Sequence, residues 1–268
     1  MATTDITQQS IEALILDMDG VLWRGGEAIG DLRSIFAQIN KIGWKVIFAT
    51  NNGSRTIQQY IEVLLSFGIK AEPWQIITSA SAATSYLRHL FPNGGPVYII
   101  GEQGILEACA ENGFYQSETG VLAVVVGIDR KITYDKLKTA TLLLRSGVPF
   151  IGTNPDRTFP TPQGLVPGAG SILAALTAAS DVAPIIVGKP EPTMYRIALE
   201  RLNIPADRTL VVGDRLETDI VGAQLLGCRT ALVLTGVTYA DQANVWQPAP
   251  NIIANDLESI VKLDWHKG

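Results

Sequence analysis

The sequence has few of the residues that bind zinc or that serve as an imidazole base. Its 268 residues include two histidines, His89 and His266, and two cysteines, Cys109 and Cys228. Zinc sites rich in histidine, zinc ribbons and disulfide scaffolds are therefore excluded. A Ser-His-Asp or Cys-His mechanism would depend on His89, which lies in a helix predicted over 83–91 and which we expect to have a structural or surface role. We expect both cysteines to be buried, reduced thiols.

The chain also lacks long apolar runs and basic clusters. Its longest strongly apolar stretch, 121–126, ends at Gly127, whereas a membrane span needs ~18 residues. The polar segment 1–10 has no Lys or Arg ahead of an apolar run, which argues against a leader peptide and favours a cytoplasmic location. The net charge is -5, and no basic cluster contains interleaved aromatic residues. We therefore expect neither a membrane nor nucleic acid as a partner.

Short apolar segments alternate with amphipathic ones along the chain. Apolar residues make up 47% of the sequence, enough for a substantial core. Helical spacing of apolar residues, as in Leu32, Phe36 and Ile39 ahead of Gly43, predicts helices between the strands. This alternation predicts an α/β fold with a parallel sheet. The predicted strands are 13–16, 45–49, 97–100, 123–128, 150–153, 185–187, 209–212 and 230–234.

Two turn-forming segments divide the chain. One is the sequence FPNGGP at 91–96, and the other is ASDVAP at 179–184. We predict that they delimit an insert, 92–183, between two parts of a core domain, 1–91 and 184–268. The alternative is that both are ordinary surface loops of a single domain.

The first polar cluster follows the strand predicted at 13–16. Asp17 and Asp19 are separated by one residue, and Gly20 permits a tight turn. Ligands usually bind at the carboxyl ends of parallel strands, where alternate residues lie on one side, so both carboxylates can face a common point. An Asp-Gly pair after a strand is also typical of a simple turn. For this motif alone both interpretations stay open.

Two further strands end in residues suited to a phosphate group. Thr50, Asn51 and Asn52 follow the second predicted strand, and their hydroxyl, amide and backbone N–H groups can hold phosphate oxygens. The alternative is an ordinary Asn-Asn-Gly loop. Lys189 follows the strand predicted at 185–187 and places a positive charge where the chain leaves the sheet. The alternative for a single lysine is solvation at the surface.

A second pair of acids follows the strand predicted at 209–212. Asp214 stands at the end of this strand. Asp219 begins a helical stretch, where it suits the helix dipole or acts as a cap. We expect these two acids to lie at the same sheet edge as Asp17 and Asp19.

A cluster of carboxylates needs a cation. Two carboxylates ~4 Å apart repel each other by about 4 kcal/mol at an effective dielectric constant near 20. The expected ligands are all oxygens, which selects a hard divalent ion, and Mg²⁺ with retained waters and a substrate phosphate is the expected cofactor.

In their order and spacing these motifs resemble the haloacid dehalogenase (HAD) superfamily of phosphatases. The resemblance is to the nitrophenylphosphatase and pyridoxal-phosphate phosphatase-like branch, subclass IIA, and it covers roughly residues 11–263. It implies a Rossmann-like parallel-sheet core with an inserted smaller α/β cap domain of the C2 type. The motifs are D-x-D-G-V-L at 17–22, T-N-N at 50–52, G-K-P at 188–190 and G-D-x-x-x-T-D at 213–219.

The resemblance implies a Mg²⁺-dependent phosphatase that hydrolyses small-molecule phosphate monoesters through an aspartyl-phosphate. Asp17 would be the nucleophile, and Asp19 the general acid and then the general base. Lys189 and Thr50 would bind the transferring oxygens. Asp17, Asp214 and the backbone carbonyl of Asp19 would hold Mg²⁺.

The remaining expectations concern residues around this centre. Asp219 would orient Lys189 or a Mg²⁺-bound water. In the cap, Asp156, Arg157 and Phe159 are the residues expected to reach the substrate, with a solvated turn as the alternative. The resemblance leaves room for a homodimer formed through the cap. A phosphomutase on the same fold and a catalytically silent binding protein remain the alternative functions.

Overall fold

The computed structural model describes residues 11–161 and 163–265, and the chain divides into two compact units. Segment 1–10, where the sequence predicts no leader, and His266 lie outside the described residues. The boundaries at 92 and 183 stay a prediction. Unit 1 comprises Met1–Thr50, Ile61–Ile77 and Lys189–Gly268, and unit 2 comprises Asn51–Tyr60 and Thr78–Gly188.

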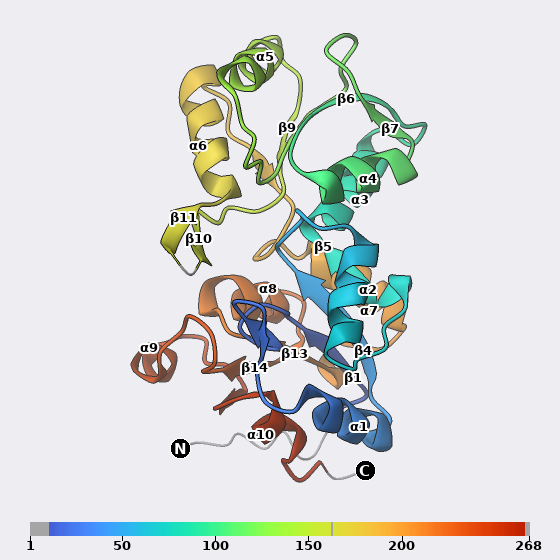
Figure 1. Cartoon of the computed structure of the whole chain (residues 1–268), viewed down its shortest axis with the longest axis vertical. Coiled ribbons are helices and arrows are strands. Elements are labelled where there is room, and N and C mark those ends of the chain that lie inside the picture. The colour runs from blue at the N-terminus through green and yellow to red at the C-terminus, as the bar shows by residue number, and fades with distance from the viewer. Residues whose placement is uncertain (1–10, 162, 266–268) are drawn as a thin grey trace. The chain divides into compact units, whose positions relative to one another are not determined.

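Unit 1 is built around a six-stranded sheet (Figure 1). Strand β1 lies between β4 and β13 and is parallel to both, and all four of its residues are buried. The carboxyl ends of these three strands therefore meet at one edge of the sheet. The order is β15 (Ile252–Ala254), β14 (Arg229–Val233), β13 (Thr209–Gly213), β1 (Ala13–Leu16), β4 (Lys45–Thr50) and β5 (Ile76–Thr78).

Helices and short turns complete unit 1. Helix α1 begins after Asp31, whose carboxylate accepts the backbone N–H of Ser34, and ends at Gly43 with φ 91°. Its Phe36 ring stacks on Phe48 of β4 with the centroids 5.8 Å apart. The other elements are β2 (Trp23–Arg24), β3 (Glu27–Ala28), α1 (Leu32–Ile42), α2 (Ile57–Ser66, shared with unit 2), η2 (Pro73–Gln75), α7 (Thr193–Leu202), η3 (Ala206–Arg208), η4 (Leu216–Ile220), α8 (Val221–Gln224), α9 (Ala240–Val245) and α10 (Leu257–Val261).

Unit 2 has a sheet and a core of its own. The five strands have the order β12-β9-β8-β6-β7, and α5 packs against α6 (Figure 1). Buried side chains of β6, β8, α5 and α6, such as Tyr98, Val124, Leu144 and Leu173, form one hydrophobic cluster. The elements are α3 (Ser79–Leu90), β6 (Gly95–Ile100), α4 (Gln103–Glu111), β7 (Phe114–Gln116), β8 (Val124–Val126), α5 (Tyr134–Arg145), β9 (Phe150–Gly152), β10 (Thr158–Thr161), β11 (Gly164–Pro167), α6 (Ala169–Ser180) and β12 (Ile185–Ile186).

The structure confirms the predicted α/β fold, and each of the eight predicted strands is present. The short strands β5, β7 and β15 were not predicted, because three residues are too few to show a periodicity. Both cysteines are buried free thiols, as predicted. His89 is exposed in the last turn of α3, in agreement with a surface role. Among the described helices none combines the length and the apolar character of a membrane span.

The complete burial of β1 generates a prediction for stability. Replacing Leu14, which is 0% exposed, by Ala removes buried methyl groups and leaves a cavity, so the free energy of unfolding should fall by about 2–5 kcal/mol. The control is Leu65→Ala on α2, where the side chain is 57% exposed and the expected change is within about 0.5 kcal/mol. Urea unfolding followed by circular dichroism measures both. Equal effects of the two substitutions would contradict the assignment of β1 to the core.

Candidate functional site

Asp17 is held at the carboxyl end of the central strand of unit 1. Its backbone N–H donates to the carbonyl of Val212 at 2.9 Å, which continues the β1–β13 pairing by one residue. The residue is 9% exposed, although it carries a carboxylate. Buried carboxylates are costly unless a cation accompanies them.

Lys189 supplies that cation. Its Nζ donates to Asp17 Oδ1 at 2.6 Å, to Asp219 Oδ1 at 2.7 Å and to the Ala49 carbonyl at 3.0 Å. An ammonium group has three N–H donors, so these bonds account for all of them. Burial disfavours the charge of Lys189, but Asp17 and Asp219 outweigh burial and raise its pKa well above the usual value. Lys189 is therefore a fixed, buried positive charge.

Both oxygens of Asp219 are occupied by protein groups. Oδ1 accepts Lys189, and Oδ2 accepts the backbone N–H groups of Asp214 at 3.2 Å and Arg215 at 3.1 Å. Asp219 lies in the π-helical turn η4, and its carbonyl accepts the Tyr195 hydroxyl at 3.1 Å. Asp219 is thus hydrogen-bonded directly to Lys189, and its role in orienting Lys189 or a Mg²⁺-bound water stays a prediction.

Asp214 follows β13 and is held by a segment that the sequence motifs do not include. The backbone N–H of Val237 donates to Asp214 Oδ2 at 2.8 Å, and the Thr235 hydroxyl donates to the carbonyl of Gly20 at 2.5 Å. A Cβ atom on Gly236 would collide with the Asp214 carboxylate. Residues 235–237 follow β14. The sequence signal that could have found them is that ligands gather at the carboxyl ends of parallel strands.

The carboxylates of Asp17, Asp214 and Asp219 form a cluster in which one oxygen of each lies within 4.8 Å of the others. Burial raises the pKa of Asp17 well above its usual value; Lys189 opposes this shift, and Asp219 and Asp214 add to it. Burial and the Asp219 charge raise the pKa of Asp214 to about 6. Three carboxylates face one ammonium, and the donors are all oxygens. This donor set fits a hard divalent cation such as Mg²⁺.

Asp19 differs from Asp17 in its surroundings. It is exposed, and its Oδ1 accepts the indole N–H of Trp23 at 2.9 Å. Met18 between the two acids is fully buried, and Gly20 turns the chain with φ 87°. The segment is therefore a turn in which the two acids meet different environments. That both carboxylates face a common point stays a prediction.

The T-N-N motif spans both units. Thr50 ends β4 in unit 1 and is 2% exposed. Asn51 belongs to unit 2, where its Nδ2 donates to Asp156 Oδ2 at 3.4 Å. The Asn52 side chain accepts Ser54 N at 3.1 Å and Ser54 Oγ at 2.7 Å, a local turn. A substrate role for Asn51 and Asn52 stays a prediction.

The loop over 153–159 is organised within unit 2. Asn154 donates to the Asn51 carbonyl at 2.9 Å, and its Oδ1 accepts the backbone N–H of Asp156 at 3.1 Å. Arg157 is exposed, and Phe159 lies in β10 with the Arg130 guanidinium 5.3 Å from its ring centroid. The roles of Asp156, Arg157 and Phe159 toward a substrate stay predictions.

Comparison with known proteins identifies relatives along nearly the whole chain. The family described as haloacid dehalogenase-like hydrolase matches residues 14–115, and the related HAD-hydrolase-like family matches 186–260. The 5'-nucleotidase YutF of Bacillus subtilis (strain 168) is 38% identical over 230 residues, which cover 86% of this chain and 90% of that protein.

Solved structures agree with these matches. The p-nitrophenyl phosphatase from Archaeoglobus fulgidus superposes with a TM-score of 0.88 at 30% identity and covers 94% of this chain and 98% of its own. The glycerol phosphate phosphatase from Mycobacterium tuberculosis in complex with magnesium gives 0.88 at 34% identity, over 95% of this chain and 77% of its own. All three relatives are named for the removal of a phosphate group. The chain thus belongs to the haloacid dehalogenase-like hydrolases of subclass IIA, and it is a phosphoric monoester hydrolase.

Proposed function

We propose that the protein hydrolyses small-molecule phosphate monoesters with the help of Mg²⁺ and through an aspartyl-phosphate on Asp17. One observation carries this proposal: Asp17 is buried against the Lys189 ammonium at 2.6 Å, within a cluster that also contains Asp214 and Asp219. A phosphate dianion that approaches Asp17 meets the fixed charge of Lys189, which reduces its repulsion by the carboxylates.

In the first step an Asp17 oxygen attacks phosphorus and the bond to the ester oxygen breaks. Asp19 gives its proton to the departing oxygen, so the alcohol leaves neutral. In the second step Asp19 takes a proton from water, which attacks the aspartyl-phosphate and releases inorganic phosphate with Asp17 restored. The exposure of Asp19 and the burial of Asp17 suit these roles, because the general acid and base must reach both the departing oxygen and the attacking water.

Other residues of unit 1 position the reacting groups. Lys189 and Thr50 would hold the transferring oxygens, while Asp219 keeps Lys189 in place. Mg²⁺ would be held by Asp17, Asp214 and the Asp19 carbonyl, and when bound it neutralises charge between the nucleophile and the phosphate. The Val237 N–H bond to Asp214 Oδ2 would hold this carboxylate in position for the metal.

We propose that the insert, with bounds at 92 and 183, selects the substrate. We propose that Asp156, Arg157 and Phe159 contact the leaving group. Asn51 and Asn52 would bind the substrate through its phosphate oxygens. The relatives are named for nucleotides, p-nitrophenyl phosphate and glycerol phosphate, so the names do not select one ester. A cytoplasmic location and a homodimer through the insert are further proposals.

The nucleophile is tested by Asp17→Asn. The amide has the shape of the carboxylate but cannot accept the phosphoryl group, so turnover of p-nitrophenyl phosphate should vanish while the circular dichroism spectrum is unchanged. Asp135→Asn, at an exposed position of α5, is the matched control and should keep full activity. Retention of about a tenth or more of kcat, in a sample shown by mass spectrometry to be free of deamidation, would exclude Asp17 as the nucleophile.

The proton donor is tested by Asp19→Asn with two substrates. A nitrophenolate leaves with little protonation, whereas an alkoxide needs a proton in the transition state. The loss in kcat/KM should therefore be about ten-fold or more larger for glycerol phosphate than for p-nitrophenyl phosphate. Equal losses on both esters would count against Asp19 as the general acid.

The metal requirement is tested through Gly236→Ala, together with Asp214→Ala. Activity should disappear in EDTA and return with Mg²⁺, while Ca²⁺ should substitute poorly because it favours larger coordination numbers. A side chain at 236 displaces the Asp214 carboxylate, so both variants should need about ten-fold or more Mg²⁺ for half-maximal activity.

Isothermal titration with Mg²⁺ gives a readout of metal affinity that is independent of turnover. The control is Gly120→Ala in unit 2, where φ is 63° and a Cβ atom meets no other atom within 4 Å, so that the added methyl strains the local backbone without touching Asp214. Unchanged Mg²⁺ affinity in both test variants would remove Asp214 from the metal site.

A further inference from the structure

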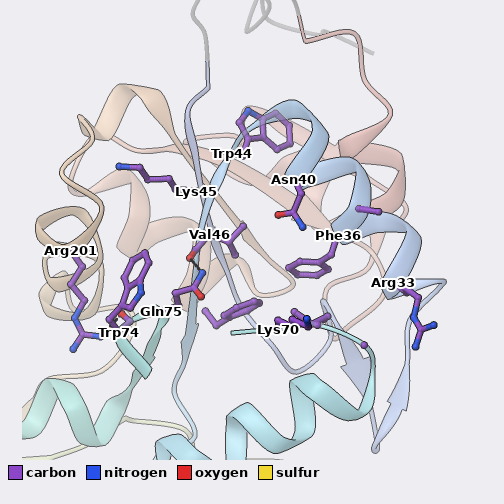
Figure 2. A pocket seen from close by; sticks show the side chains of 14 residues that line it. Arg33, Phe36, Asn40, Trp44, Lys45, Val46, Lys70, Trp74, Gln75 and Arg201 are labelled. Atoms are coloured by element: carbon purple, nitrogen blue, oxygen red, sulfur yellow. Dashed lines mark hydrogen bonds between the residues drawn. The ribbon is translucent and has the colours of Figure 1, made fainter. Parts of the chain in front are cut away.

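Unit 1 contains a groove that the proposed mechanism does not use. It has a volume of ≈ 610 Å³ and lies between α1, the start of β4 and the segment 68–75 (Figure 2). Binding sites for small molecules in proteins have volumes of about 300–1,000 Å³. The groove is therefore large enough for a ligand of cofactor or nucleotide size.

The groove is cationic, although the chain as a whole has a net charge of -5. Arg33, Lys45, Lys70 and Arg201 line it, and no Asp or Glu does. In the described part of the chain none of these four forms a salt bridge. Four cations with no carboxylate among the lining residues create a local positive potential that attracts an anion.

Two of these cations are held in place by backbone carbonyls. Arg201 Nη1 donates to the carbonyls of Trp74 at 2.8 Å and Ile76 at 3.1 Å, and Lys45 Nζ donates to the Leu202 carbonyl at 3.3 Å. These bonds fix the positions of the two charges without neutralising them. Arginine and lysine held in this way are preorganised donors for phosphate or another oxyanion.

The groove also has one exposed aromatic side chain, that of Trp74, beside three buried ones. Phe36, Phe48, Trp44 and Trp74 line it, and Trp74 is 46% exposed, which is high for an indole. Figure 2 shows Trp74 next to Arg201. A planar ring can stack on such an exposed indole, while its charged substituents reach the neighbouring cations.

The groove lies away from the carboxylate cluster. Its lining includes β4 residues from Lys45 to Phe48, but it does not include Thr50 or any of Asp17, Lys189, Asp214 and Asp219. A ligand in the groove would therefore bind without occupying the place of the substrate phosphate.

We propose that this groove binds a small anion with an aromatic ring, of the nucleotide class, at a second site distinct from the catalytic edge. The cations would contact its phosphate groups and Trp74 its base. Two copies of the chain, each with a net charge of -5, repel one another at long range, whereas a small anion is attracted by the four cations that line the groove.

The test uses adenosine 5'-(α,β-methylene)diphosphate, whose bridge is not cleaved, with the full chain in EDTA. Binding is followed by tryptophan fluorescence and by isothermal titration. Lys70→Glu and Trp74→Ala should each weaken binding by about ten-fold or more. The matched controls are Arg88→Glu and Tyr134→Ala, an exposed cation and an exposed aromatic of unit 2, and both should bind as the wild type does. Adenosine alone and methylenediphosphonate alone should each bind more weakly than the whole probe.

Three outcomes would overturn the proposal. The first is a loss of probe affinity in Lys189→Met that Trp74→Ala does not share, because the probe would then bind at the catalytic edge. Thr50→Val replaces Lys189→Met if that variant does not fold. The second is an absence of binding by the wild type at millimolar probe concentration. The third is a dimer in sedimentation velocity that Trp74→Ala dissociates, because the groove would then be a contact between copies of the chain.

Discussion

The buried ammonium group of Lys189 is the charge on which the arrangement of the carboxylates depends. Removing an ammonium from water costs several kcal/mol, and the cost is offset when every N–H finds an acceptor in good geometry. Lys189 meets this condition with Asp17, Asp219 and the Ala49 carbonyl. The three partners come from the end of β1, from η4 after β13 and from β4. Only a sheet with β1 between β4 and β13 brings them to one point.

The crowding of carboxylates at the carboxyl edge of the unit 1 sheet also limits which residue types can stand next to them. Gly20, Gly213 and Gly236 each lie where a Cβ atom would collide with Asp214 or Asp219. These close approaches let the two carboxylates sit beside the backbone, whose N–H groups then fix their oxygens. The acids are consequently held by hydrogen bonds and by steric fit.

Most of the fold, and the position of the motif residues at the ends of neighbouring strands, could be predicted from the sequence, because these strands are long and apolar enough to recognise. Asp17, Thr50 and Asp214 are of this kind. The roles of Thr235 and Val237 could not be predicted, since one acts through a hydroxyl and the other through a backbone N–H, and neither residue type signals chemistry. The Asn52 side chain, in contrast, is used in a local turn that competes with a ligand for the same oxygen.

Two of the chain crossings between the units fall inside the motifs. The chain leaves unit 1 between Thr50 and Asn51, and it returns between Gly188 and Lys189. On the unit 1 side of the return, Lys189 is fixed by three hydrogen bonds, and on the unit 2 side a Cβ atom on Gly188 would collide with the Thr153 carbonyl. A rearrangement of unit 2 that displaced Lys189 would leave the Asp17 and Asp219 carboxylates buried without their cation. A change of sequence in unit 2 is therefore compatible with the site only where it leaves this ammonium group in place.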